Sequence, residues 1–355
     1  MDEYFNKILP YKNQRALVFL VDSSKESHPL LKLAGNMASI PTQHLMLETA
    51  ESDHKSQTLE NIVLQCNAKS GGLNYAVDFM DSKLDLNRGN ILLIGLDVTH
   101  PTGEHRRGAT LEPSFVGITG NYLPHPCAIA GKFFAQESRQ ESVDSEQLVD
   151  SVLEMLEKAS KFRRIDTVVL KRDGCSEGQY NMVLTQELQA IEKACADFFK
   201  HKRTSIIGII VTKSSNVRHF DVSNNVRPQN LPYGSVITFG TRALYDEFFI
   251  CPHHAYQGTS KAILVTIVRN DLKIGINDIE KFLYALATLH QVSCSIVSLP
   301  ESIMQADKLA FKGQLIYRAY LSNYLHGDQN NLDYKAHTKM ISFDEGKLPN
   351  FRYTA

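Results

Sequence analysis

Two aspartates in this 355-residue chain occupy positions where a hydrolytic metal site could form. Asp97 lies near the carboxyl end of the apolar run ILLIGLDV, and Asp173 lies at the end of DTVVLKRD. Two carboxylates held together repel, so one is forced neutral unless a cation lies between them. Divalent cations such as Mg²⁺ prefer oxygen ligands, and two ions about 4 Å apart can activate a water and stabilise the leaving oxygen in phosphodiester cleavage. The alternative is that each aspartate begins a turn or caps a helix, and Asp173-Gly174 is also ordinary turn chemistry.

The elements that would carry these aspartates follow the order β-β-β-α-β-α-β. Apolar runs too short for helices predict strands, and amphipathic runs predict helices. The expected strands are 91–98, 114–123, 127–136, 166–174 and 205–213, and the expected helices are 145–162 and 181–200. The first three strands form an antiparallel meander. This is the order of a ribonuclease-H-like α/β domain, in which the first and fourth strands are neighbours, so Asp97 and Asp173 should meet at one edge.

The first 85 residues form a separate α/β segment in this interpretation. A strand is expected at 16–21, a helix at about 28–37, an extended piece at 42–47, and a helix at 58–72 that ends on Gly71-Gly72. The polar, interrupted stretch 78–90 is the expected boundary. Near the other end, residues 325–349 are polar and are expected to be rich in loops.

Four segments along the chain resemble characteristic segments of the PIWI domain of Argonaute proteins, in that family's order and spacing. They are GLDVTHP (95–101), RDGCSEGQ (172–179), QGTS (257–260) and SLPESIMQADKLAF (298–311). The resemblance covers essentially the whole chain, and the first 85 residues are similar to the second half of the preceding MID domain. It implies an α/β fold with a partial Rossmann-like MID segment at 1–85 and a ribonuclease-H-like PIWI domain at 86–355.

The resemblance also implies a catalytic tetrad. Asp97 and Asp173 match the first two catalytic aspartates, and Asp307 matches the last member, which is Asp or His in the family. Glu141, in the segment Arg139-Gln140-Glu141, matches a glutamate that the family inserts from a loop. Asp97, Asp173 and Asp307 are therefore the expected ligands of two Mg²⁺ ions, with Mn²⁺ as an alternative. The alternative is that the four residues are retained but do not catalyse cleavage.

A second set of residues matches the MID-domain pocket for the 5′ phosphate of the guide: His28, Lys32, Gln43 and Lys69. His28 and Lys32 are four residues apart, so they lie on one face of the expected helix. The usual family residue at the first position is Tyr, and His28 resembles a nematode-specific branch whose guides carry a 5′ triphosphate. Gln65 occupies a position that is often Lys in the family, which leaves one phosphate contact in question.

Because the net charge is −1, nucleic-acid binding must come from local patches. Residues 200–275 carry ten Lys and Arg against four Asp and Glu, a local net charge of 10 − 4 = +6. Lys213, Arg218, Lys261 and Lys312 match family positions that touch guide phosphates. Lys261 and Lys312 replace a common Arg, which keeps the charge but loses bidentate pairing. The alternative for each is a merely solvated basic face.

The expected function is small-RNA-guided RNA binding in gene silencing, with metal-dependent endonucleolytic cleavage of the paired target RNA. One alternative is a non-cleaving module that holds guide RNA and recruits partners, and another is a generic structure-directed nuclease. The expected partners are a small guide RNA, a complementary target RNA and proteins of a silencing complex. No membrane is expected, because the apolar runs are far shorter than the roughly 20 residues needed to cross one.

Six dispersed cysteines without a CxxC pair predict a reducing compartment, and the polar N-terminus is not a secretory signal. The expected location is the cytoplasm, with the nucleus as an alternative. A full Argonaute also carries N and PAZ domains, which this sequence does not contain. The chain is therefore expected to be a fragment, a divergent short gene product or an incomplete gene model.

Overall fold

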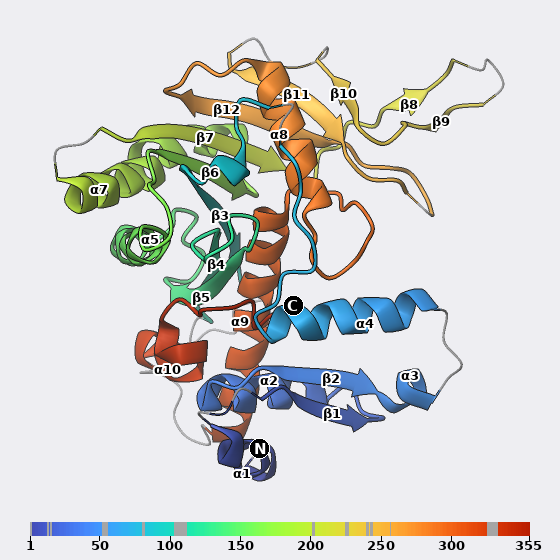
Figure 1. Cartoon of the computed structure of the whole chain (residues 1–355), viewed down its shortest axis with the longest axis vertical. Helices are drawn as coiled ribbons and strands as arrows, with labels where there is room; N and C mark the ends of the chain where they lie inside the picture. Colours follow the sequence, from blue (N-terminus) through green and yellow to red (C-terminus); the bar gives the residue numbers. More distant parts are fainter. Residues whose placement is uncertain are drawn as a thin grey trace.

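A computed structural model of the chain describes residues 2–12, 14, 16–51, 56–79, 82–102, 112–200, 203–223, 227–238, 241, 244–255, 257–324 and 333–355. An eight-stranded mixed sheet lies at its centre, and a two-stranded parallel sheet lies beside it near the N-terminus (Figure 1).

The central sheet has the strand order β10-β11-β12-β7-β6-β3-β4-β5. Its strands are β3 (Ile91–Thr99), β4 (Ser114–Gly120), β5 (Ala130–Gln136), β6 (Thr167–Asp173), β7 (Ser205–Thr212), β10 (Ser235–Ile237), β11 (Asp246–Cys251) and β12 (Ile263–Asn270). The expected meander β3-β4-β5 is antiparallel, and β6 lies parallel to both β3 and β7. The predicted α/β fold is confirmed. The sheet is larger than the five predicted strands, because β10, β11 and β12 extend it beyond β7.

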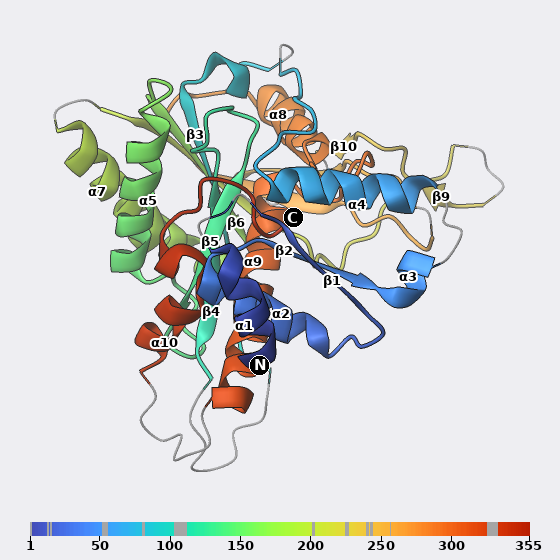
Figure 2. The ribbon, with the colours of Figure 1, turned by 60° about the horizontal axis from the view of Figure 1, so that its bottom comes forward.

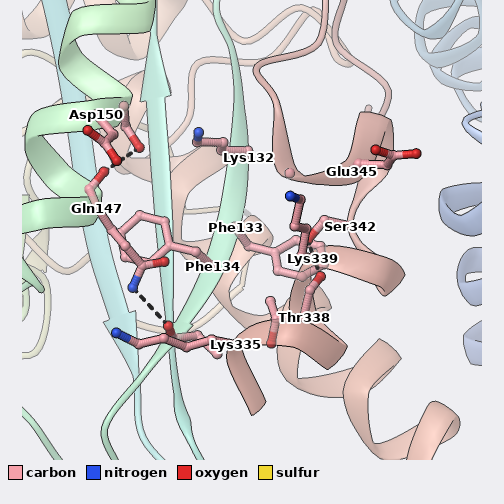
Figure 3. Close-up of a pocket in the computed structure, with 13 residues that line it drawn as sticks. Lys132, Phe133, Phe134, Gln147, Asp150, Lys335, Thr338, Lys339, Ser342 and Glu345 are labelled. Carbon is pink, nitrogen blue, oxygen red and sulfur yellow. Dashed lines mark hydrogen bonds between the residues drawn. The ribbon is translucent and has the colours of Figure 1, made fainter. Parts of the chain in front are cut away.

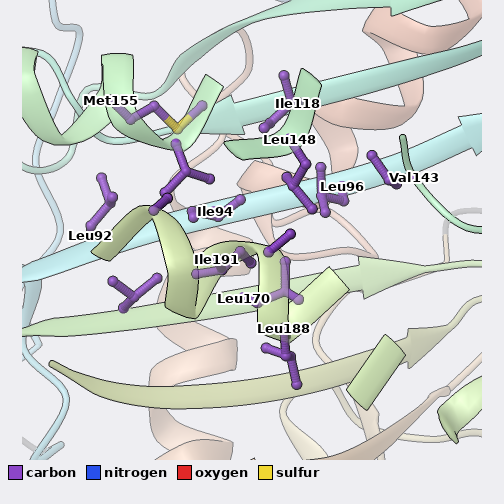
Figure 4. Packing of buried hydrophobic residues seen from close by; sticks show 14 of the residues in the cluster. Leu92, Ile94, Leu96, Ile118, Val143, Leu148, Met155, Leu170, Leu188 and Ile191 are labelled. Atoms are coloured by element: carbon purple, nitrogen blue, oxygen red, sulfur yellow. The ribbon is translucent and has the colours of Figure 1, made fainter. Parts of the chain in front are cut away.

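Helices cover both faces of this sheet, which explains why its central strands are buried along most of their length and largely apolar. Along β3, side chains alternate between the two faces: Leu92 and Ile94 pack toward α5 (Ser145–Ala159) and α7 (Leu188–Phe199), as Figure 4 shows. Leu93 lies in the cluster on the opposite face, together with residues of α8 (Ile276–Thr288) and α9 (Glu301–Tyr324).

Helix α9 lies very close to the sheet because glycines stand beneath it. A Cβ atom built on Gly95 would collide with the carbonyl of Ser302, and one built on Gly117 would collide with the carbonyl of Ala306. These two glycines therefore let the first turns of α9 lie directly on β3 and β4. The contact fixes the position of the next residue of the helix, Asp307.

The N-terminal unit forms the four elements expected from its sequence, together with two short helices, at 2–8 and 47–51, that the sequence analysis did not predict. It contains α1 (Asp2–Ile8), β1 (Val18–Asp22), α2 (Ser27–Ala38), β2 (Thr42–Met46), α3 (Leu47–Glu51) and α4 (Ser56–Lys69), and β1 pairs with β2 in parallel. Gly71 follows α4 with φ +89°, a conformation that glycine adopts without strain. Helix α2 packs on α9, and its Leu33 joins the cluster of Phe133 and Leu309 (Figure 2).

The expectation of loops at 325–349 is partly wrong. Residues 334–341 form α10 (Tyr334–Ile341), which begins where the Asp333 carboxylate accepts a hydrogen bond from the Ala336 amide. Residues 325–332 lie outside the described part. A short hairpin, β8 (Phe220–Asp221) and β9 (Gln229–Asn230), projects beside β10 (Figure 1). Among the described residues, no helix combines the length and apolar character that crossing a bilayer requires.

Candidate metal and phosphate sites

Three carboxylates from distant parts of the sequence meet at one edge of the central sheet. Asp97 lies on β3, Asp173 ends β6, and Asp307 lies on α9. The parallel register pairs Leu96 with Arg172, so Asp97 and Asp173 lie side by side and project to the same face. One oxygen from each of the three side chains lies within 4.8 Å of the others. The adjacency predicted for Asp97 and Asp173 is present, and Asp307 completes the group.

The ammonium of Lys213, just after β7, lies among these carboxylates. Its Nζ atom is 2.8 Å from Asp173 Oδ2, 2.8 Å from Asp307 Oδ1 and 3.9 Å from Asp97 Oδ2. Burial and the charge of Asp173 raise the pKa of Asp97 to about 7, and burial likewise raises the pKa of Asp173. Burial favours the neutral amine of Lys213, but the surrounding carboxylates outweigh it and raise the lysine pKa. Among the described residues, the three carboxylates thus share a single ammonium within ion-pair distance.

The donor set fits hard divalent cations. All three groups offer carboxylate oxygens, which Mg²⁺ and Mn²⁺ prefer, and no softer ligand belongs to the cluster among the described residues. Asp173 is fully buried, and its Oδ1 atom has no hydrogen-bond partner within the described residues. A buried acceptor of this kind is costly unless a donor or a cation satisfies it. The site therefore suits a cation, and its chemistry does not distinguish between the two metals.

Glu141 lies in the loop between β5 and α5, next to this cluster but outside it. Its Oε2 atom accepts a hydrogen bond from Gln179 Nε2 at 3.0 Å and lies 3.4 Å from His100 Nε2. His100 follows β3, three residues after Asp97, and Gln179 follows β6, six residues after Asp173. The side chain of Glu141 is half-exposed. The loop therefore places the predicted fourth carboxylate at the border of the site.

A buried ion pair holds the Glu141 loop against the sheet. The Arg172 guanidinium donates to Glu187 through Nε at 3.1 Å and to the Glu141 carbonyl through Nη2 at 3.0 Å. Glu187, on the π-helical turn Val183–Glu187, also accepts a hydrogen bond from the Val143 amide. The sequence analysis missed Arg172 and Glu187 as site residues. Arg172 stands within the RDG segment, whereas Glu187 carries no comparable sequence signal.

The four residues assigned to the guide phosphate also lie together, between α2, β2 and the end of α4. Lys32 Nζ donates to the Thr42 carbonyl at 2.5 Å, and Lys69 Nζ donates to Gln43 Oε1 at 2.5 Å. Lys32, Gln43 and Lys69 are buried. The half-buried ring of His28 lies 5.5 Å from that of His44. Gln65, in the position often taken by Lys, accepts a 3.4 Å hydrogen bond from Gln43.

Burial, reinforced by repulsion between neighbouring cations, lowers the pKa values of this cluster. Burial lowers the pKa of Lys69 to about 8, and burial together with the charge of Lys32 lowers the pKa of His28 to about 4. Lys312, on α9, belongs to the same cluster: burial and the charges of Lys32 and Lys69 lower its pKa, and its Nζ donates to the Thr354 carbonyl at 2.6 Å. A bound anion would reverse these shifts, because it favours the charged form of each lysine.

The other predicted RNA contacts are placed differently. Lys213 lies among the aspartates, as described above. Arg218 is exposed and donates to carbonyls of its own loop, to Ser215 at 2.5 Å and Val217 at 3.0 Å. Lys261 is exposed two residues before the start of β12. Arg218 and Lys261 have the exposure that a backbone contact needs, and their contact with RNA stays a prediction.

Comparison with known proteins places this arrangement in a family. The family model for the Piwi domain matches residues 16–318 and runs across the expected boundary at 78–90. Among solved structures, Kluyveromyces polysporus Argonaute with a guide RNA has a TM-score of 0.83 at 17% identity, covering 100% of this chain and 41% of that one. The C-terminal lobe of a budding yeast Argonaute has a TM-score of 0.79 at 16% identity, covering 100% of this chain and 72% of that one.

Clostridium butyricum Argonaute bound to a guide DNA and a 19-mer target DNA has a TM-score of 0.64 at 19% identity, covering 94% of this chain and 41% of that one. The chain thus spans less than half of the first and last of these three proteins. Identities this low show the shared fold, whereas the match to the Piwi domain covers most of the chain. The chain belongs to the Piwi-domain family of Argonaute proteins.

Proposed function

We propose that this chain binds a small guide RNA in gene silencing and cleaves the target RNA that pairs with the guide. The observation that carries the proposal is the convergence of Asp97, Asp173 and Asp307, from β3, β6 and α9, with oxygens within 4.8 Å. Proteins of similar fold were solved with a guide RNA and with a guide and target DNA. Guide pairing would select the sequence, and the protein would contact the nucleic-acid backbone and shape.

The three aspartates would hold the divalent cations. When bound, those ions supply an activated water and stabilise the leaving oxygen of the cleaved phosphodiester. Glu141, held by Gln179 and lying near His100, presents a carboxylate at the border of the site that can accept hydrogen bonds from ordered water. Arg172 maintains this arrangement through the loop carbonyl of Glu141.

The lysine cluster would bind the guide. In this proposal residues 1–85 form a partial MID-like segment and residues 86–355 form the PIWI domain. His28, Lys32, Gln43 and Lys69, joined by Lys312, surround the 5′ phosphate. A bound anion would relieve the repulsion among the buried cations of this pocket. The imidazole of His28, beside His44, can stack on the first base and donate to phosphate, so His28 can take the role of the Tyr that is usual in the family.

The non-cleaving silencing module remains a second candidate, and Lys213 is the observation that favours it. Its ammonium already neutralises part of the acidic cluster, with contacts of 2.8 Å to two of the aspartates. A protein that held this ion pair permanently would keep metal out and would bind guides without cutting. The proposed cleavage therefore requires that metal ions compete successfully with Lys213.

A cleavage assay on the purified protein tests the proposal. The protein is loaded with a 5′-phosphorylated or 5′-triphosphorylated guide and offered a labelled complementary RNA with Mg²⁺ or with EDTA. We expect one Mg²⁺-dependent cut at a fixed distance from the 5′ end of the guide. It should disappear in Asp97→Ala and persist in Asp197→Asn, whose side chain is exposed on α7. Tight guide binding without a cut would favour the non-cleaving module, and unchanged binding and cutting in Lys32→Ala would favour a generic nuclease.

A further inference from the structure

A groove along the outer edge of the central sheet contains none of the residues proposed for the metal or the guide phosphate, although the Phe133 ring also lines the cavity beside Lys32 and Lys312. The groove is formed by β5, α5 and α10, has a volume of about 280 Å³, and is lined by Lys132, Phe133, Gln147, Asp150 and Lys339 among others (Figure 3). None of these residues has a part in the proposed cleavage or guide binding. A ligand longer than the groove would extend out of it at either end.

The floor of the groove is an unpaired strand edge. β5 is the last strand of the sheet, so among the described residues no strand pairs with it on this side. The Ala135 carbonyl accepts a hydrogen bond from Gln147 Nε2 at 3.1 Å, which shows that the peptide groups of Ala135 point outward. In an antiparallel pair, outward peptide groups alternate along the strand. The N–H and C=O of Phe133 therefore also face the groove and can pair with an extended chain.

The two walls of the groove differ in charge. On α10, Lys339 is exposed, and its ammonium has no hydrogen bond or ion pair with any residue in the described part of the chain. Lys335, one turn earlier on the same side, lies 3.7 Å from Asp144. On α5, the opposite wall carries Asp150, which is exposed. The exposed Glu345 also lines the groove but forms no ion pair with Lys339, so among the described residues Lys339 is the lysine of this groove without an ion-pair partner.

Side-chain alternation along β5 connects these charges to a strand. Phe133 projects into the cluster that contains Ile341 of α10, whereas Phe134 projects into the cluster of α5. A residue paired with Phe133 would project its side chain on the same face, toward α10 and Lys339. Its immediate neighbours would project toward α5 and Asp150. An acidic side chain is therefore favoured at the position facing Phe133 and disfavoured at the adjacent positions.

We propose that this groove binds an extended peptide segment of a partner protein. The segment adds to β5 as a further strand through the peptide groups of Phe133, and it places an acidic side chain beside Lys339. Backbone pairing supplies affinity, and the alternating walls supply specificity, as in other strand-addition complexes. The groove uses none of the side chains proposed to bind the metal ions or the guide phosphate.

The probe is a fluorescein-labelled hexapeptide of alternating Thr and Val with one central Glu, and binding is followed by fluorescence anisotropy. We expect Lys339→Glu to weaken binding by about tenfold or more, which corresponds to the loss of a charge-assisted contact and its replacement by repulsion. Lys281→Glu, at an exposed position on α8, makes the same charge change away from the groove and should leave binding unchanged. Guide binding should be unaffected in both variants.

Two further measurements address the strand pairing itself. N-methylation of every second peptide amide in one register should abolish binding, whereas methylation of the intervening amides should be tolerated. Hydrogen exchange should slow at residues 131–135 when the peptide binds. Equal binding to wild type and Lys339→Glu, equal loss in both methylated peptides, or no binding up to about 1 mM would overturn the proposal. Self-association of the chain that Lys339→Glu abolishes would assign the groove to a second copy and would also overturn it.

Discussion

Replacing Asp97 by Asn should stabilise the metal-free protein at neutral pH and remove its response to Mg²⁺. The reason is the electrostatics of the acidic cluster. Asp97 and Asp173 are both buried, and Lys213 is the one ammonium within ion-pair distance of them in the described part of the chain. Asn keeps the size and the hydrogen-bonding ability of the side chain but carries no charge. The substitution therefore removes repulsion without opening a cavity.

The magnitude follows from the pKa of Asp97, which burial and the charge of Asp173 raise from 3.8 to about 7. Because the folded-state pKa lies above the unfolded value, the folded protein binds more protons between these limits. The stability of the metal-free protein therefore falls as pH rises from about 4 to about 7. A shift of about 3 pKa units corresponds to about 4 kcal/mol, since one unit equals about 1.36 kcal/mol. The amide in Asp97→Asn does not titrate, so this position should cause no loss of stability as pH rises over the same range.

The assay is urea unfolding followed by far-UV circular dichroism, because the chain contains no Trp. Wild type, Asp97→Asn and the control Asp197→Asn are compared in EDTA at several pH values from 4 to 7, and again with Mg²⁺ at pH 7. The free energy of unfolding of Asp97→Asn relative to wild type should rise with pH. Mg²⁺ should stabilise wild type and the control only. Parallel pH profiles of wild type and Asp97→Asn in EDTA would refute the reasoning.

Three other changes test other parts of the structure. Lys69→Met should weaken binding of a 5′-phosphorylated guide by at least about tenfold and that of a 5′-hydroxyl guide much less, as filter binding would show. Because the pKa of Lys69 is about 8, wild-type affinity for the phosphate should fall above that pH. Arg172→Met leaves Glu187 buried and uncompensated, and should cost about 3–5 kcal/mol in urea unfolding. Gly117→Ala forces α9 from the sheet, and should cost about 1–3 kcal/mol and weaken the Mg²⁺ response measured by thermal unfolding.

The sequence was sufficient to predict the part of the acidic site that depends on strand order. Short apolar runs bounded by polar loops define β3 and β6, and a parallel register then places Asp97 beside Asp173. Asp307 could not be predicted in this way. Its position depends on how closely α9 lies on the sheet, which is decided by the absence of side chains at Gly95 and Gly117. Only the resemblance to a known family connected Asp307 with the other two residues.

The local sequence pattern did not predict elements and ion pairs that depend on contacts with other parts of the chain. Residues 334–341 are polar and short, yet they form α10, because Ile341 is buried in the cluster of Phe133 and Leu309. The short strand β10 is stabilised by pairing with β11. Glu187 looked like an ordinary polar residue of a helix, and its partner Arg172 comes from a strand fifteen residues earlier. The hydrophobic periodicity of the sequence could not predict these contacts.

The Lys213 side chain has two possible partners, the acidic cluster and a phosphate of the nucleic acid, and it cannot contact both at the same time. The family resemblance predicts it as a contact for guide phosphates, and in the structure its ammonium lies 2.8 Å from both Asp173 and Asp307. A divalent cation among the same carboxylates would bring more positive charge than Lys213 does, and would repel the ammonium. The displaced side chain, more than one-third exposed already, would then be free to pair with a phosphate. Metal binding and contact with the nucleic-acid backbone would therefore favour each other, because each removes the competitor of the other from the acidic cluster.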